Sequence, residues 1–129
     1  MNRKQFLKWL TDTIAQFAFF PDLLSELLDI LSETGVENKF IKTLVLRLQV
    51  LGQDGVLAIT SKEFESIGDG IFSMHLPGKG YNIRILYSFL DNQQPVLLYA
   101  FYERAGKRKT DYSMHIPAAI ERLKQLKEG

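Results

Sequence analysis

The residues of this sequence best suited to chemistry are basic groups that lie close to aromatic rings. The densest basic run contains Arg104, Lys107, Arg108 and Lys109, and it follows a segment rich in Tyr and Phe that ends at Tyr102. Cations neutralise phosphate and rings stack on unpaired bases, so this composition is typical of an RNA-binding surface. The alternative is a solvated loop, because short basic clusters are common on protein surfaces.

A second set of candidate residues comes from two predicted strands. Residues 81–89 alternate between apolar and polar types, which predicts a strand with Arg84 on the face opposite its apolar side chains. His75 is out of phase with the apolar residues of the preceding strand, so a hairpin in register would place it on the face of Arg84. Lys79 lies in the turn between them. Arginine binds phosphate oxygens and histidine exchanges protons near neutral pH, so such a cluster suits a phosphodiester.

Each of these residues also has a structural interpretation. An arginine within a strand is commonly the ion-pair partner of an acidic neighbour, and Glu103 is the candidate here. A single histidine on a sheet is commonly a surface residue, and His115 is assigned no role. Trp9 is expected in the core. The sequence contains no Walker phosphate loop and no legible Ser-His-Asp order.

The elements that must position these residues follow from hydrophobic periodicity. Helices are predicted over residues 2–18, 22–35, 36–51 and 113–127, with a short strand over 15–20 as an alternative. Strands are predicted over residues 71–76, 81–89 and 96–102, and residues 56–67 are irregular or weakly extended. This order predicts an α+β fold with N-terminal helices, an antiparallel sheet of three to four strands and a C-terminal helix.

Composition limits the class of protein. The 129 residues carry a net charge of +1 and fit one domain. The absence of cysteine excludes a disulfide scaffold and thiol catalysis, and no metal or cofactor is expected. No apolar stretch of about 18 residues and no signal-peptide pattern is present, so the sequence predicts a cytoplasmic protein that binds no membrane.

Three segments carry a resemblance to a known family. They are GDGIFSMH at 68–75, YNIRILY at 81–87 and VLLYAF at 96–101. Their order resembles the RelE/ParE toxin superfamily, closest to its phage-derived HigB-like branch of type II toxin–antitoxin toxins, and Thr110, Ala119 and Arg122 fall at matching places. The resemblance covers roughly residues 40–126. It implies a single RelE-like domain over 1–129 with residues 1–21 as an N-terminal helical extension.

The resemblance also implies an activity. Most such toxins are endoribonucleases that cleave mRNA, often in the ribosomal A site, by attack of the ribose 2′-OH on the adjacent phosphate without a metal ion. Arg84 matches the family strand arginine that stabilises the phosphate, and Arg104 matches a lysine at the strand end. Lys107, Arg108 and Lys109 would hold the RNA backbone. The implied partners are mRNA, the ribosome and a small helix-turn-helix antitoxin.

The sequence departs from the family pattern at three positions. His75 stands where the family has arginine, Glu103 replaces a strand-end lysine and would repel phosphate, and Tyr99 replaces a histidine. His75 could carry a proton or mark an altered activity. The alternative functions are therefore a non-nucleolytic ParE-like gyrase poison, or an inactive module that binds RNA or antitoxin on the same fold.

Overall fold

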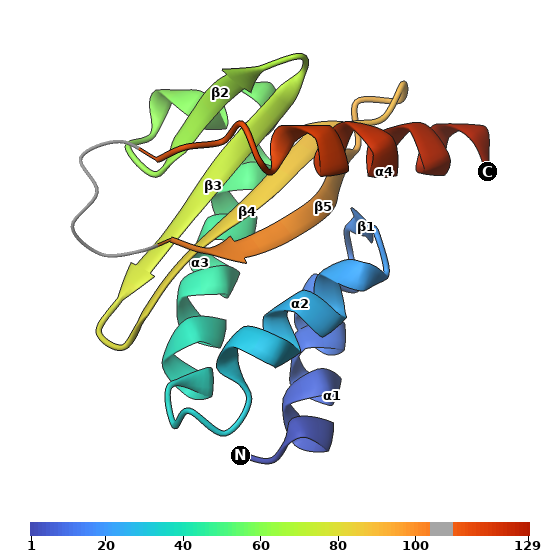
Figure 1. Cartoon of the computed structure of the whole chain (residues 1–129). Coiled ribbons are helices and arrows are strands. Elements are labelled where there is room, and N and C mark those ends of the chain that lie inside the picture. The colour runs from blue at the N-terminus through green and yellow to red at the C-terminus, as the bar shows by residue number, and fades with distance from the viewer. Residues whose placement is uncertain (104–109) are drawn as a thin grey trace.

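The computed structural model describes residues 1–103 and 110–129 (Figure 1). Its helices are α1 (Arg3–Ile14), α2 (Asp22–Leu31), α3 (Glu37–Asp54) and α4 (Ile116–Glu128), with a 3₁₀ helix η1 (Gly55–Thr60) after α3. Its strands are β1 (Ala18–Phe19), β2 (Phe64–Gly68), β3 (Ile71–Gly78), β4 (Tyr81–Phe89) and β5 (Pro95–Tyr102). The predicted α+β class and its order of helices, sheet and closing helix are confirmed.

The described strands form one five-stranded sheet in the order β1-β5-β4-β3-β2. Strands β3, β4 and β5 pair antiparallel, as predicted, and β2, in a segment predicted as irregular or weakly extended, pairs antiparallel with β3. Strand β1 pairs parallel with β5 through Ala18 and Phe19. The sheet is therefore mixed, and it has one strand more than the predicted range. The alternative of a short strand over residues 15–20 accounts for that addition, because α1 ends at Ile14.

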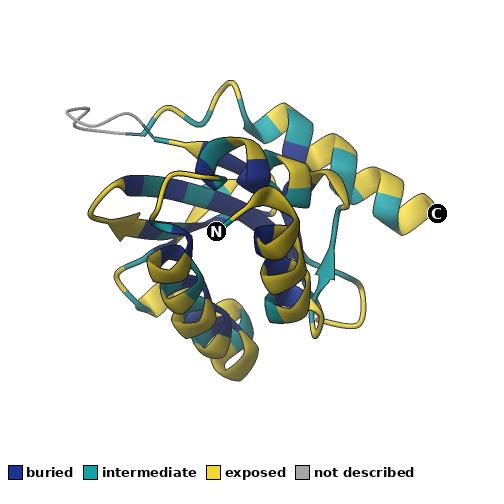
Figure 2. Cartoon of the chain, turned by 90° about the horizontal axis from the view of Figure 1, so that it is seen from below, coloured by how far each residue is buried: buried dark blue, intermediate teal, exposed yellow. Residues whose placement is uncertain are grey.

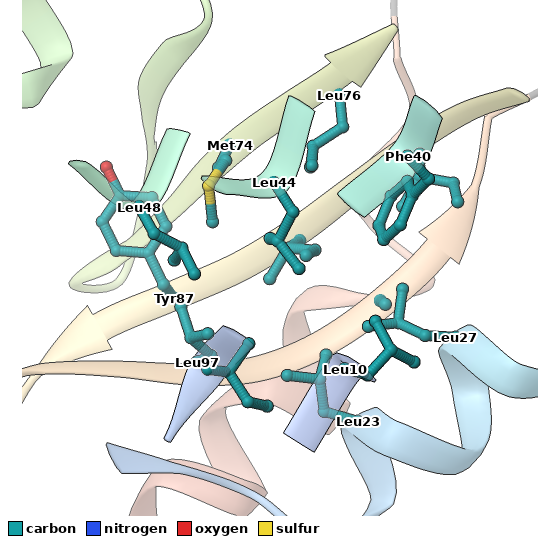
Figure 3. Close-up of a cluster of buried hydrophobic side chains, with 14 of the residues drawn as sticks. Leu10, Leu23, Leu27, Phe40, Leu44, Leu48, Met74, Leu76, Tyr87 and Leu97 are labelled. Atoms are coloured by element: carbon teal, nitrogen blue, oxygen red, sulfur yellow. The ribbon is translucent and has the colours of Figure 1, made fainter. Parts of the chain in front are cut away.

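The sheet separates two hydrophobic layers. Helices α1, α2 and α3 turn their buried sides toward one face of the sheet, and α4 covers part of the other face (Figures 1 and 2). Figure 3 shows the larger layer, in which side chains of the three N-terminal helices meet those of β3, β4 and β5. Strand β5 carries apolar side chains on both faces because both layers pack against it.

Helix α1 belongs to the larger layer, but the expected core position of Trp9 is wrong. Phe6, Leu10 and Ile14 are fully buried, whereas Trp9 is 45% exposed. The three buried residues lie four positions apart and define one stripe of the helix. Trp9 precedes Leu10 by one residue, a rotation of about 100° on a helix of 3.6 residues per turn, and so lies on the solvent side.

The open edge of β5 beyond β1 is closed by two charged side chains. Glu26 of α2 accepts a hydrogen bond from the Ala100 amide at 3.1 Å, and Arg122 of α4 donates to the Leu98 carbonyl at 2.9 Å. Arg122 and Glu26 also pair with each other, at 2.6 and 2.8 Å. Helices on opposite faces of the sheet are thereby joined at its edge, and that part of β5 cannot pair with another strand.

Tyr87 gives a first test of the core. It is fully buried, and among the described residues its hydroxyl has no hydrogen-bond partner. Burial raises the pKa of Tyr87 well above its ordinary value. Because an unsatisfied buried hydroxyl is destabilising, Tyr87→Phe is expected to raise the free energy of unfolding by about 1 kcal/mol in urea titrations.

Tyr81 provides the matched control for this substitution. Its hydroxyl lies 2.6 Å from the Thr43 hydroxyl, so Tyr81→Phe removes a hydrogen bond. This variant is expected to lower the free energy of unfolding by about 1 kcal/mol. Equal destabilisation by both substitutions would contradict the assignment of Tyr87 as unsatisfied.

Candidate functional site

His75 and Arg84 lie side by side on the sheet. The β3–β4 register pairs them directly, as expected for a hairpin in register. Their neighbours Met74 and Ile85 are fully buried in the layer under α1 to α3, so His75 and Arg84 occupy the opposite face. The two side chains are 22% and 14% exposed, respectively, which leaves them accessible at the end of the sheet that α4 does not cover.

Arg84 is held by acidic and aromatic neighbours. Its Nε donates to a Glu103 carboxylate oxygen at 2.6 Å, and its Nη1 lies 3.8 Å from Glu65. The Tyr112 ring centroid lies 6.0 Å from the guanidinium carbon. The ion pair with Glu103 that the structural interpretation anticipated is therefore present.

His75 is fixed in orientation through both ring nitrogens. Nδ1 lies 3.0 Å from a Glu63 carboxylate oxygen, and Nε2 lies 2.6 Å from Asn82 Oδ1. The Asn82 amide nitrogen donates to the Glu103 backbone carbonyl at 3.3 Å, which turns its oxygen toward the imidazole. Both ring nitrogens thus lie against oxygen atoms of neighbouring side chains, which fixes the plane of the ring.

Glu103 connects the members of the cluster. One carboxylate oxygen accepts from Arg84 and lies 3.9 Å from His75 Nε2, and the other accepts from the Thr110 hydroxyl at 2.5 Å. Burial acts to raise the pKa of Glu103, but the hydrogen bonds from Arg84 and Thr110 and the charges of Arg84 and His75 outweigh it. The pKa of Glu103 consequently lies below its ordinary value, and the carboxylate is an anion at neutral pH.

This shift predicts a pH dependence of stability. A carboxylate with a lowered pKa in the folded state stabilises the protein fully above its unfolded-state pKa and loses that contribution as pH falls through the folded-state value. We expect wild-type protein to be more stable than Glu103→Gln at pH 7, and this difference to shrink as pH falls below the ordinary value of 4.5. Urea unfolding of both proteins between neutral pH and about pH 3 measures it, and a constant difference would contradict the prediction.

Tyr112 closes one side of the cluster from the segment before α4. Its hydroxyl donates to the Glu65 carboxylate and lies 3.0 Å from the Ser73 hydroxyl on β3. Burial, with the hydrogen bond to Glu65, raises the pKa of Tyr112 to about 12, so the phenol keeps its proton at neutral pH. Tyr112 therefore acts here as a hydrogen-bond donor.

The other predicted site residues are distributed differently. Lys79 is exposed at the tip of the hairpin, beyond the register pair of Gly78 with Tyr81. Tyr102 is paired with Ile83, which faces the layer under α1 to α3, and is 52% exposed. The predicted residues Arg104, Lys107, Arg108 and Lys109 lie outside the described residues.

Sequence reasoning missed several members of the cluster. Asn82 could have been found, because strand alternation places it on the face of Arg84. Glu63 and Glu65 could not, because they belong to or adjoin β2, which was not predicted as a strand. Only Phe64 of β2 is buried, so this strand has too few apolar positions to show a period of two.

The fold and the cluster define an α+β protein with a charged, partly buried site on one sheet face. Comparison with protein-family models and with curated proteins finds no match for this chain. Within residues 1–103 and 110–129, no group of three or more His, Cys, Asp or Glu side chains is arranged to hold a metal ion. The described helices include none with the length and apolar character needed to span a membrane.

Proposed function

We propose that this protein is a cytoplasmic mRNA endonuclease of the RelE/ParE type, the toxin of a type II toxin–antitoxin pair. The observation that carries the proposal is the direct pairing of His75 with Arg84 on an accessible sheet face. Glu103 and Thr110, which flank the basic run in the sequence, are hydrogen-bonded to each other at the same cluster. A phosphate-binding arginine, a proton-exchanging histidine and a basic run in sequence are what RNA cleavage without a metal requires.

The reaction assigned to this site is an internal transesterification. The ribose 2′-oxygen forms a bond to the adjacent phosphorus as the bond from phosphorus to the 5′-oxygen breaks, which gives a 2′,3′-cyclic phosphate and a 5′-OH. The proton lost by the 2′-OH must be accepted, and the departing 5′-oxygen must receive one. Arg84 stabilises the negative charge that develops on the phosphate, and its terminal nitrogens supply the donors because Glu103 engages Nε. His75 accepts the proton of the 2′-OH, and the departing 5′-oxygen takes up a proton from solvent.

The charge balance of the cluster favours a second candidate function. Glu63, Glu65 and Glu103 surround Arg84 and His75, so carboxylates outnumber cations among the described side chains in contact. A phosphate must overcome this negative potential to reach Arg84. The second candidate is accordingly a non-nucleolytic protein on the same fold, either a ParE-like gyrase poison or a module that binds RNA or a helix-turn-helix antitoxin.

Induced expression of the chain alone in a bacterium, with transcript ends mapped by primer extension, tests the proposal. We expect growth arrest and new 5′-OH ends within translated frames, both of which vanish in Arg84→Gln. Arg3→Gln is the matched control, because the Arg3 side chain is 54% exposed and its ion-pair partner among the described residues is Asp29 at the surface. It removes the same charge away from the site and is expected to behave as wild type.

The other outcomes of this experiment discriminate between the candidates. Growth arrest with intact transcripts would reject the nuclease and favour a gyrase poison. Normal growth with intact transcripts would favour the binding module. New ends that persist in Arg84→Gln would show that cleavage does not use this site.

A further inference from the structure

We infer that a groove beside the cluster, between the end of β5 and the start of α4, binds an unpaired nucleobase of the RNA. This inference rests on the proposed function, because it assigns a subsite for the substrate of that site. The groove is lined by Phe101, Tyr102, Glu103, Thr110, Met114 and His115, with Asp111 at its rim. Glu103 and Thr110 are thus shared between the groove and the Arg84 cluster.

The floor of the groove presents a flat aromatic stack. The His115 ring lies on the Phe101 ring, with centroids 3.8 Å apart and an angle of 9° between the planes. The Tyr99 hydroxyl is hydrogen-bonded to His115 Nδ1 at 3.0 Å, and this contact fixes the imidazole ring in its position. Burial lowers the pKa of His115, so the ring is neutral at neutral pH and offers an uncharged face for stacking.

The rim of the groove carries an exposed apolar side chain. Met114 is 81% exposed, a high value for a side chain of this size, whereas the Tyr102 side chain lies with Ile83 on the opposite face of the sheet. Aromatic rings stack on bases, and the methionine thioether makes favourable contacts with ring edges. A flat heteroaromatic ring therefore matches Met114 and the His115 ring better than an aliphatic group does.

The polar groups at the groove select a nucleotide over a free aromatic group. The Glu103 carboxylate and the Thr110 hydroxyl can accept hydrogen bonds from the edge of a base. Arg84 lies directly beyond Glu103, where it can bind the phosphate joined to that base. Because carboxylates accept N–H groups, bases with an exocyclic amino group (adenine, cytosine and guanine) should be preferred over uracil.

Binding of short single-stranded oligonucleotides to the full chain tests this inference. Dissociation constants are measured for hexamers of A, C and U at several salt concentrations, with wild-type protein and with Met114→Ala. This variant is expected to bind oligo-A and oligo-C roughly two- to tenfold more weakly, because a contact between a thioether and an aromatic ring contributes a factor of about that size. Its salt dependence should be unchanged, because no phosphate contact is lost.

Leu57→Ala is the matched control. Leu57 is 65% exposed on η1, outside the groove, so removing its side chain should leave all three dissociation constants unchanged. Thermal unfolding of each variant verifies that the substitutions, all at exposed side chains, leave the fold intact.

The outcomes separate this inference from the proposed function. If wild-type protein binds and cleaves RNA but Met114→Ala binds equally well, or if oligo-U binds as tightly as oligo-A, the groove is not the base subsite and the nuclease proposal stands. If affinity drops in Met114→Ala with no cleavage by wild type, the groove is supported and the nuclease is rejected. If wild-type protein binds no RNA, both are overturned.

Discussion

Glu103→Gln is expected to raise the affinity for single-stranded RNA roughly 10- to 100-fold and to raise the rate of cleavage with it. In the folded protein the Glu103 carboxylate occupies the Nε of Arg84 at 2.6 Å and lies 3.9 Å from His75 Nε2. It is therefore an internal anion held where a phosphate would be bound. Two unit charges about 4 Å apart repel by up to about 4 kcal/mol at a protein surface, and about 1.4 kcal/mol already corresponds to tenfold.

Glutamine keeps the shape of the side chain and can still accept the Thr110 hydrogen bond. The substitution thus removes the charge while it preserves the geometry. It also removes the closer of the two ion pairs of Arg84, so higher affinity should be accompanied by lower stability at neutral pH. Fluorescence anisotropy with labelled RNA and urea unfolding, performed on the same preparation, measure the two effects.

Glu121→Gln is the control for net charge, because Glu121 is exposed on α4 and, in the described part of the chain, accepts a side-chain hydrogen bond from Gln125 alone. It should change RNA affinity by less than twofold if local rather than overall charge governs binding, since exposed charges are screened beyond about 10 Å at ordinary salt. Unchanged or reduced affinity in Glu103→Gln would show that Arg84 serves the fold rather than a phosphate. That result would favour the non-nucleolytic candidate.

Deletion of residues 1–21 is expected to abolish folding. The deletion removes α1, whose Phe6, Leu10 and Ile14 are fully buried, and β1, which pairs with Val96 and Leu97 of β5. Loss of each large buried side chain costs about 2–5 kcal/mol, so the three together approach or exceed the 5–15 kcal/mol stability of a typical domain. Circular dichroism and a urea titration of the truncated chain should show no cooperative transition.

Substitutions at the exposed side of α1 provide the control for this deletion. Leu7 and Trp9 are 38% and 45% exposed, so their replacement by alanine should cost less than about 1 kcal/mol each. A truncated chain that unfolds cooperatively would show that α1 is an appendage, as the extent of the family resemblance implies. The burial of Phe6, Leu10 and Ile14 argues instead that α1 is an integral part of the core.

Periodicity predicted the parts of the fold whose elements are long. The alternation around Arg84 established both the strand and the face of each side chain, and β4 shows that arrangement. The strand β1 has two residues and is defined by its pairing with β5. It is too short to show an alternation of apolar and polar residues in the sequence. The position of Trp9 was mispredicted because a hydrophobic residue next to the buried stripe of a helix looks the same in sequence as one within it.

The site could be predicted only in part for a related reason. Alternation placed His75 and Arg84 together, and Glu103 was named as the partner of Arg84 by charge alone. Whether Arg84 is free or paired depends on where β5 ends relative to β4, and Arg84 is opposite Phe101, two residues before Glu103. That register is set by tertiary packing, so no local pattern distinguishes the two states.

The parallel pairing of β1 with β5 also sets the order in which the chain can fold during synthesis. Ala18 leaves the ribosome before its partner Val96, which follows only after three helices and three other strands. Until then α2 lacks the strand it packs against, and its apolar side stays exposed in the nascent chain. Long-range contacts of this kind slow folding and prolong exposure to aggregation. A protein proposed to act on translated mRNA thus completes its own sheet only after β5 has itself been translated.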